Sequence, residues 1–239
     1  VLRSLGLESV NKPLAHYGLS VVLGTCEVRL MDLANAYACL AREGEYRPLR
    51  FLEAERGASG AGAPTPRGHR PEGGPAPEER RPADPTGMGC APAGVRVFSP
   101  EAAWLVADIL RGDERALAVT GHRLDTVLPR YALKTGTSAG FRDAWAVGYN
   151  PEYVVAVWVG NPDGRAAKQL VGIEAAAPIV NALFRGFYPG GGGPEWARPA
   201  GIGERSVCVE SGACAGPGCA VRSGWAITGI SARPMCAGH

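Results

Sequence analysis

The residues of this chain best suited to chemistry lie within the segment Tyr131–Val159. Lys134, Thr135, Gly136 and Thr137 place an amine, two hydroxyls and a glycine side by side at the end of a predicted strand. Glycine has no side chain, so the backbone at such a position can approach a ligand closely. We therefore take these four residues as the candidate site.

Three consecutive antiparallel strands are predicted to position the candidate site. They cover residues 131–135, 144–149 and 153–159, which are rich in β-branched and aromatic residues. Asn150-Pro151 supplies a tight turn between the second and third strands. The small-residue loop Gly136–Gly140 joins the first two.

Helices are predicted on both sides of these strands in the sequence. Thr25 is expected to cap a helix that runs to about Glu43 and stops at Gly44. Ser99 is expected to cap a second helix that ends at Gly112. A third covers 175–188, with its start near Ala177 because Pro178 fits only a first turn. The expected apolar stripes are Leu30, Leu33, Ala34, Tyr37 and Ala41 in the first helix, and Ala102, Leu105, Val106 and Ile109 in the second. Met31, Tyr37 and Cys39 are expected in or near the core.

Ser9 and Lys12 have the spacing of a catalytic serine and its lysine base, S-x-x-K. Such a pair must face one cleft from successive turns of a helix, but Lys12 precedes Pro13, which disfavours helical geometry. The same residues match S-x-N, and one short peptide cannot form two opposite walls of a cleft. We therefore reject Ser9 as a nucleophile.

Ser138 stands in a sequence that matches the G-x-S-x-G nucleophile elbow of α/β-hydrolases. That motif needs an apolar strand before it and a helix after it, with an acid and a histidine further along the chain. A predicted strand follows Ser138 instead, and His239 is the one downstream histidine. We reject the elbow as well.

Lys134-Thr135-Gly136 resembles the K-T-G motif of the serine transpeptidases and β-lactamases. The wider string KTGTSAGFRDAWAVGYN resembles the bifunctional class A penicillin-binding proteins of the 1C type, which polymerise and cross-link peptidoglycan. The resemblance extends to LRSLGLESVNKP, to HYGLSVVLGTCEVRLMDLANAYACLAREGEYRPLRFL, to FSPEAAWLVADIL and to the cysteine-bearing tail. It implies part of an α+β serine transpeptidase/β-lactamase-like domain, with an antiparallel sheet and flanking helices, followed by a short Cys- and Gly-rich C-terminal module.

The resemblance also assigns roles to the site residues. Lys134 and Thr137 are implied to be catalytic, the lysine through its charge and a proton-path hydrogen bond, and Thr137 through a backbone N–H in the oxyanion hole. Thr135, Gly136 and Thr137 are implied to bind substrate. The hydroxyls meet the carboxylate of a stem peptide or β-lactam, and the glycine leaves room for the acyl group.

By the same resemblance, the S-x-x-K and S-x-N motifs fall upstream of Val1. We expect a fragment of a peptidoglycan DD-transpeptidase that lacks its nucleophile and is inactive alone. The whole protein is expected on the periplasmic side of the inner membrane, held by an anchor outside this chain, and bifunctional with a glycosyltransferase. Its expected partners are D-Ala-D-Ala stem peptides and β-lactams, and its acyl acceptor could be an amine or water. The alternative is a non-catalytic peptidoglycan-binding or scaffold protein on the same fold.

Composition agrees with a globular chain long enough for a sizeable core. The 239 residues are 46% hydrophobic and 20% charged, with a formal net charge of +2. This balance gives no reason to expect nucleic-acid or membrane-surface binding. No apolar run approaches the length of a membrane span. The start at Val1, without Met, suggests a cut rather than a natural terminus.

Five regions are predicted along the chain. Residues 1–52 form the helical part of the transpeptidase domain, and 95–189 form its sheet part. Residues 53–94 are expected to be a disordered linker, because Gly, Ala, Pro, Arg and Glu dominate it and cannot bury enough surface to offset the entropy of ordering. Residues 190–205 are a second linker, and 206–239 begin the C-terminal module.

The seven cysteines are Cys26, Cys39, Cys90, Cys208, Cys214, Cys219 and Cys236. A zinc site in the tail is conceivable, but the tail has no C-x₂-C pair, so no metal and no cofactor are predicted. The resemblance matches Cys208, Cys219 and Cys236 to cysteines of 1C-type tails. An extracytoplasmic location would permit disulfides, and a Cys208–Cys219 bridge is the preferred pairing.

Overall fold

The computed structural model describes residues 1–51, 94–112, 128–166, 170–231 and 234–237. The chain forms one compact unit from Val1–Pro48 with Gly94–His239, and a second from Leu49–Ala93. The helices and strands of the described residues belong to the first unit. The predicted linker over 53–94 lies outside the described residues, apart from Gly94.

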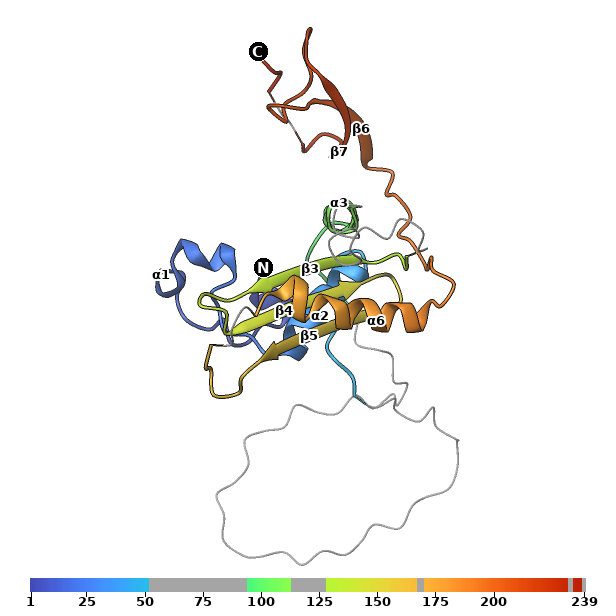
Figure 1. The fold of residues 1–239 in the computed structure, drawn as a ribbon. Helices are drawn as coiled ribbons and strands as arrows, with labels where there is room; N and C mark the ends of the chain where they lie inside the picture. Colours follow the sequence, from blue (N-terminus) through green and yellow to red (C-terminus); the bar gives the residue numbers. More distant parts are fainter. Residues whose placement is uncertain (52–93, 113–127, 167–169, 232–233, 238–239) are drawn as a thin grey trace, which may run out of the picture. The chain divides into compact units, whose positions relative to one another are not determined.

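A three-stranded antiparallel sheet forms the centre of the first unit (Figure 1). Its strands are β3 (Ala132–Thr137), β4 (Asp143–Tyr149) and β5 (Val154–Gly160), in that spatial order. The prediction of three consecutive antiparallel strands is confirmed, and β3 runs two residues further than predicted. The Asn150 side chain fixes the turn between β4 and β5 by accepting two backbone N–H groups.

Helices cover both faces of this sheet. On one face lie α2 (Leu30–Ala41) and α3 (Pro100–Leu110), and on the other lie α5 (Gly172–Ala175) and α6 (Ala177–Phe187) (Figure 1). The start of α6 at Ala177 agrees with the prediction made from Pro178. An antiparallel sheet with flanking helices is the α+β arrangement expected from the sequence.

Two hydrophobic cores result, because side chains alternate between the faces along each strand. In β3, Ala132 packs into the core beneath α2 and α3, whereas Leu133 packs into the core beneath α5 and α6. The first core contains Ala41, Trp104, Ala107, Leu110, Ala132, Tyr149, Trp196 and Ile202. The second contains Leu133, Ala144, Ala146, Ala176, Ala177, Val180 and Phe184. Burying a side chain such as Val180 or Phe184 contributes roughly 1.5–3 kcal/mol.

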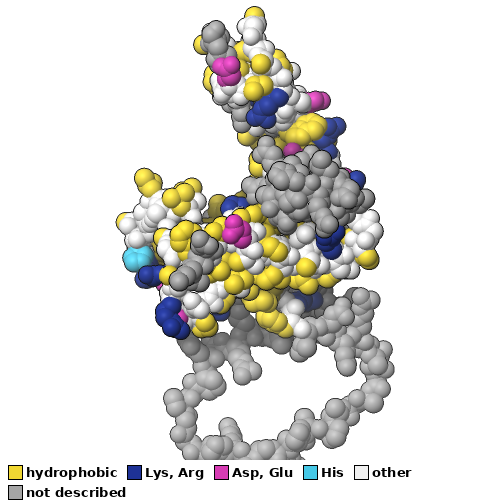
Figure 2. Space-filling model, viewed as in Figure 1, with side chains coloured by type: hydrophobic (Ala, Val, Ile, Leu, Met, Phe, Trp, Pro, Cys, Tyr) yellow, Lys and Arg dark blue, Asp and Glu magenta, His cyan; other side chains and the backbone are white. Residues whose placement is uncertain are grey.

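The outer side of α6 is apolar too. Ile179, Leu183 and Phe187 are each more than two-fifths exposed, and Figure 2 shows apolar side chains gathered over this helix.

The start of α2 differs from the prediction. The helix begins after Arg29, which has extended backbone and binds Asp32 in the first turn through its guanidinium, with Nε 2.7 Å from Oδ2. Thr25 lies five residues before the helix, and its hydroxyl donates to Ser20 Oγ instead of capping. The predicted stop at Gly44 is supported by its left-handed φ of 91°. Met31 is 49% exposed, so its expected place near the core was wrong.

The cap of α3 was predicted correctly, but its buried stripe was not. Ser99 Oγ accepts the N–H of Ala102, with Pro100 in the first turn. The buried residues are Ala103, Trp104, Ala107 and Leu110. Val106 and Ile109 are exposed. Both sets have helical spacing, and the bulky Trp104 side chain turns its own set toward the sheet.

The remaining elements are short or lie in the C-terminal part. They are η1 (Arg3–Leu5), α1 (Leu14–Tyr17), η2 (Leu19–Leu23), the antiparallel pair of β1 (Glu45–Tyr46) with β2 (Val95–Arg96), and the antiparallel pair of β6 (Ile202–Cys208) with β7 (Val221–Ile227). None of the helices in the described residues combines the length and apolarity needed to cross a membrane.

The predicted linker over 190–205 contains ordered core residues. Trp196 is buried in the first core, and its indole N–H donates to the carbonyl of Ala41 at 2.9 Å. Ile202 is buried in the same core and opens β6, so the C-terminal hairpin starts four residues before the predicted boundary at 206. Residues 190–205 are rich in glycine and proline, so their composition did not indicate that Trp196 and Ile202 are core residues.

Gly172 allows α5 to approach the sheet closely. A Cβ at this position would lie 2.4 Å from the carbonyl oxygen of Gly136 and 2.8 Å from that of Trp145. Both oxygens belong to paired strands and cannot move aside cheaply. We expect Gly172→Ala to lower the free energy of unfolding by about 1–3 kcal/mol, as overpacking usually does.

The matched control for this change is Gly186→Ala in α6. A Cβ there would meet nothing within 4 Å, so the substitution should be neutral or stabilise by up to about 1 kcal/mol. Urea unfolding of both variants checks the prediction. Equal midpoints for the two would show that the close approach at Gly172 carries no steric constraint.

The Tyr131 phenol predicts a loss of stability at alkaline pH. Its ring stacks on Phe184, with centroids 4.1 Å apart, and its hydroxyl donates to Asn181. Burial raises the pKa of Tyr131 from 10.0 to about 12. The folded state therefore keeps this proton to higher pH than the unfolded state, so the contribution is present below pH 10 and is lost as pH rises toward 12. Tyr131→Phe should lose less stability than the wild type between these pH values in unfolding titrations, and a parallel loss would contradict this.

Candidate active site

Lys134 lies in the middle of β3, opposite Val147 of β4, and its side chain is exposed. Because side chains alternate between the two faces of a strand, the Lys134 side chain leaves β3 on the same face as Ala132. Its Nζ donates a hydrogen bond to the carbonyl oxygen of Thr135. The amine is therefore drawn along the strand toward the next residue, instead of extending straight into solvent.

The outer edge of β3 has no partner strand among the described residues. In the described part of the chain β3 pairs with β4 alone. The N–H of Ser138 donates to the carbonyl of Asp143 at 2.9 Å, so Ser138 faces β4. Because backbone groups alternate in direction along an antiparallel strand, the N–H and C=O groups of Thr135 and Thr137 point away from β4. The amine of Lys134 and these groups thus lie along one open edge.

The Thr137 hydroxyl is held by α5, which covers the face of β3 opposite to the Lys134 side chain. The backbone N–H of Gly172 donates to Thr137 Oγ1 at 3.0 Å. This bond uses a lone pair of the oxygen and leaves the hydroxyl hydrogen available to a ligand. The side chain of Thr135 leaves β3 on the same face and is half-buried. The structure therefore brings the four predicted site residues together on one short stretch of strand.

Ser138 has a structural role in the turn between β3 and β4. Its Oγ accepts the N–H of Asp143 at 2.8 Å, and its carbonyl accepts the N–H of Phe141. Asp143 in turn accepts the indole N–H of Trp158 at 2.9 Å. A strand follows this turn, as predicted, so the geometry of a nucleophile elbow is missing here.

Ser9 and Lys12 do not share a helix. Both lie between η1 and α1, and the Nζ of Lys12 lies 3.3 Å from Nε2 of His16. The carbonyl of Ser9 accepts a hydrogen bond from the Tyr17 hydroxyl. The structure therefore supports rejecting this pair as nucleophile and base.

Gly172 is the site residue that the sequence prediction missed. It contacts both Gly136 and Thr137, although it lies 35 residues after the threonine. Its helix, α5, has only four residues and precedes the predicted closing helix. The one local signal is a glycine inside the apolar run Leu170–Ile173, which suggests close backbone contact but does not say with what.

Three tail cysteines could hold a metal ion. The sulfur atoms of Cys208, Cys219 and Cys236 lie within 4.8 Å of one another. The structure records no disulfide between Cys208 and Cys219, the pairing preferred from the sequence. The spacing of these residues in the sequence did not predict that the Cys236 sulfur would lie beside those of Cys208 and Cys219.

Comparison with known proteins identifies the family to which this chain belongs. The family model for the penicillin binding protein transpeptidase domain matches residues 6–185. Penicillin-binding protein 1C of Escherichia coli K12 is 30% identical over 88% of this chain, and Penicillin-binding protein 2D of Bacillus subtilis is 24% identical over 91%. The alignments cover 23% and 30% of those proteins, so this chain spans less than a third of either.

The fold is shared with a solved structure. The crystal structure of Penicillin-Binding Protein 1A from Haemophilus influenzae matches with a TM-score of 0.66 over 98% of this chain and 37% of that one, at 17% sequence identity. The predicted serine transpeptidase fold and the resemblance to the 1C type are confirmed. The chain belongs to the penicillin binding protein transpeptidase domain family.

Proposed function

We propose that this chain forms the K-T-G wall of a DD-transpeptidase site that cross-links peptidoglycan stem peptides through an acyl-enzyme. The observation that carries the proposal is the open edge of β3, where the Lys134 amine and the backbone groups of Thr135 and Thr137 lie together. Membership of the transpeptidase family supports it. The substrate class is the D-Ala-D-Ala end of a stem peptide, which β-lactams imitate.

An extended peptide can bind this edge as an additional strand. Main-chain hydrogen bonds to an open sheet edge give affinity without requiring a preformed pocket. Gly136 adds no side chain, so an acyl group can lie close to the backbone. The substrate carboxylate is bound in this proposal by the Lys134 charge and the Thr135 and Thr137 hydroxyls.

The chemical step requires a serine oxygen to attack the carbonyl carbon of the D-Ala-D-Ala bond. The C–N bond then breaks, and the terminal D-Ala leaves with a proton. The N–H of Thr137 is one donor to the oxyanion that forms during attack. The Lys134 charge favours deprotonation of neighbouring hydroxyls or amines. An amine of a second stem peptide then takes the acyl group and releases the serine.

The nucleophile belongs, in this proposal, to residues outside this chain. The positions of Ser9 and Ser138 support this, because neither has a lysine base on the same helix. The matched part is less than a third of either relative, which leaves room for the serine motifs, a glycosyltransferase domain and a membrane anchor. We place the whole protein on the periplasmic side of the inner membrane.

The first prediction concerns this chain alone. Incubation with a fluorescent penicillin should give no covalent adduct, because its two candidate serines lack catalytic geometry. The longer protein that contains this sequence should label under the same conditions and serves as the control. Intact-mass and peptide mass spectrometry are the measurements, and an adduct on Ser9 or Ser138 would refute the assignment. Failure of the longer protein to label would favour the non-catalytic scaffold.

The second prediction concerns Lys134 in that longer protein. Lys134→Ala should slow acylation by a β-lactam roughly a hundredfold or more, because a positioned proton-transfer group contributes at least that much. Stability should change by no more than about 0.5 kcal/mol, since the side chain is exposed. Lys134→Arg should rescue acylation only in part, because guanidinium keeps the charge but not the compact geometry.

Lys12→Ala is the matched control for charge. It removes one exposed amine from the same chain, at a residue rejected as catalytic, and acylation should stay at the wild-type rate. The measurement is the second-order acylation rate of each variant beside its melting temperature. Unchanged acylation in Lys134→Ala would remove Lys134 from the site.

A further inference from the structure

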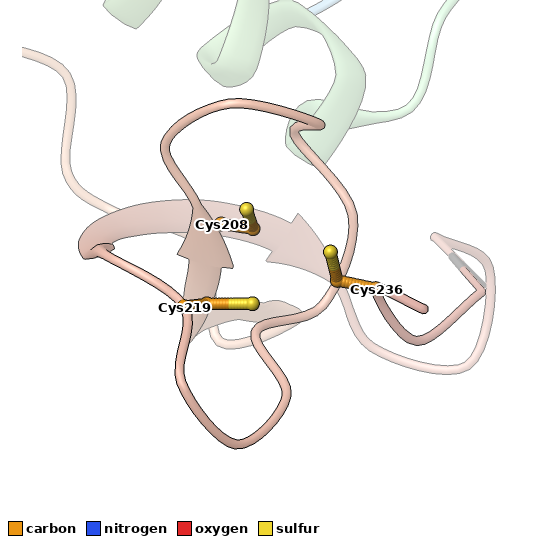
Figure 3. A group of neighbouring side chains, drawn as sticks. All are labelled: Cys208, Cys219 and Cys236. Carbon is orange, nitrogen blue, oxygen red and sulfur yellow. The ribbon is translucent and has the colours of Figure 1, made fainter. Parts of the chain in front are cut away.

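The C-terminal hairpin brings three thiols together from three segments. Cys208 ends β6, Cys219 lies in the loop before β7, and Cys236 lies in the tail after the hairpin. Figure 3 shows the three side chains converging, and their sulfur atoms all lie within 4.8 Å of one another. Cys208 is fully buried, and the other two are half-buried.

The backbone around each cysteine is held in place. Each cysteine N–H donates to a carbonyl of a neighbouring segment or turn. These bonds are Cys208 to Ala213 at 2.9 Å, Cys219 to Gly216 at 3.3 Å and Cys236 to Cys214 at 2.8 Å. A Cβ on Gly216 would lie 3.1 Å from the carbonyl of Cys236, so the loop and the tail are in close contact. The convergence is therefore built by the backbone and does not depend on side-chain rotation alone.

This part of the chain has a small core to hold it. Its only regular sheet in the described residues is the β6–β7 pair, and a two-stranded hairpin is marginally stable by itself in water. Among the described residues of 202–236, the buried hydrophobic ones are Ile202, Val207, Cys208 and Ala226. Small modules of this kind are commonly stabilised by disulfides or a structural metal.

We propose that Cys208, Cys219 and Cys236 bind a zinc ion that ties β6, the loop and the tail together. Thiolates are soft ligands that favour zinc. Around a tetrahedral zinc with Zn–S bonds of about 2.3 Å, sulfur atoms lie about 3.8 Å apart, so the observed group needs to contract only slightly. The three sulfurs fill three positions and leave the fourth to water or another donor.

Zinc accounts for the third sulfur, which a disulfide does not. A Cys208–Cys219 bond would join two segments, leave Cys236 outside the cross-link and require a two-electron oxidant. Zinc has no redox step, so binding needs neither oxidant nor reductant. Three S–H bonds lose their protons, three Zn–S bonds form, and the protons pass to solvent.

Zinc binds the deprotonated form of each cysteine, so its affinity for the group should rise with pH through the range in which thiols ionise.

The test is metal binding by the full chain, reduced and freed of metal with a chelator. Zn²⁺ added without oxygen should bind one ion per chain and release about three protons near neutral pH. Cd²⁺ in place of Zn²⁺ should give ultraviolet thiolate-to-metal charge-transfer absorption. Cys219→Ser and Cys236→Ser should each lower zinc affinity roughly a hundredfold or more, since even outer-shell changes cost about 10–100-fold. Because Cys208 is fully buried, its substitution disturbs packing whatever its role, so the two half-buried positions are decisive.

Cys214→Ser is the matched control. Cys214 lies in the same loop, with its sulfur 3.7 Å from the Arg205 guanidinium, and it is outside the group of three sulfurs. Its substitution should leave the zinc stoichiometry and affinity unchanged. The proposal is overturned if the reduced, folded chain binds no zinc, or if Cys214→Ser weakens binding as much as Cys219→Ser. Isolation of a Cys208–Cys219 disulfide together with no zinc binding after reduction would also overturn it.

Discussion

The arrangement of the whole unit depends on one constraint, which is that β3 is covered on both faces and paired on one edge. Ala132 and Leu133 bury opposite faces against different helices, so the strand cannot tilt or shift by one residue without exposing a core. Pairing with β4 fixes one edge. The other edge then presents the backbone of Thr135 and Thr137 rigidly, as the proposed positioning of a reacting carbonyl would require.

Coverage by α5 and α6 also explains how a polar site can stand beside an apolar core. Gly172 contacts Gly136 and Thr137 on the face that carries Val180 and Phe184 further along. The threonine oxygen gains a fixed donor and the helix start gains an acceptor for one of its orphan N–H groups. A small side chain at residue 172 is therefore needed for the core and for the site.

Much of this could be predicted from local sequence because the strands carry strong local signals. The pattern of β-branched and aromatic residues and the Asn150-Pro151 turn located β3, β4 and β5, and K-T-G located the polar edge. The missed features depend on partners distant in sequence. In α3, two sets of apolar residues have the same helical spacing. Packing against the sheet decides that Trp104 is buried and Ile109 is exposed. Likewise, the sequence around Gly172 does not predict its hydrogen bond to Thr137, and the sequence around Trp196 does not predict its hydrogen bond to Ala41.

The tail cysteines show the same limit in a sharper form. Ligand motifs such as C-x₂-C are recognised because both ligands come from one turn, whereas Cys208, Cys219 and Cys236 are separated by strands and loops and meet only through folding. Ligand motifs in the sequence therefore cannot reveal a group of thiols assembled from three segments. The anchored backbone at each position favours a shared ligand over incidental proximity, since orienting three thiols costs conformational entropy that hydrophobic packing of half-buried residues recovers only in part. The zinc ion proposed for these thiols would supply that free energy, at a distance in sequence from the K-T-G edge and with no residue in common with it.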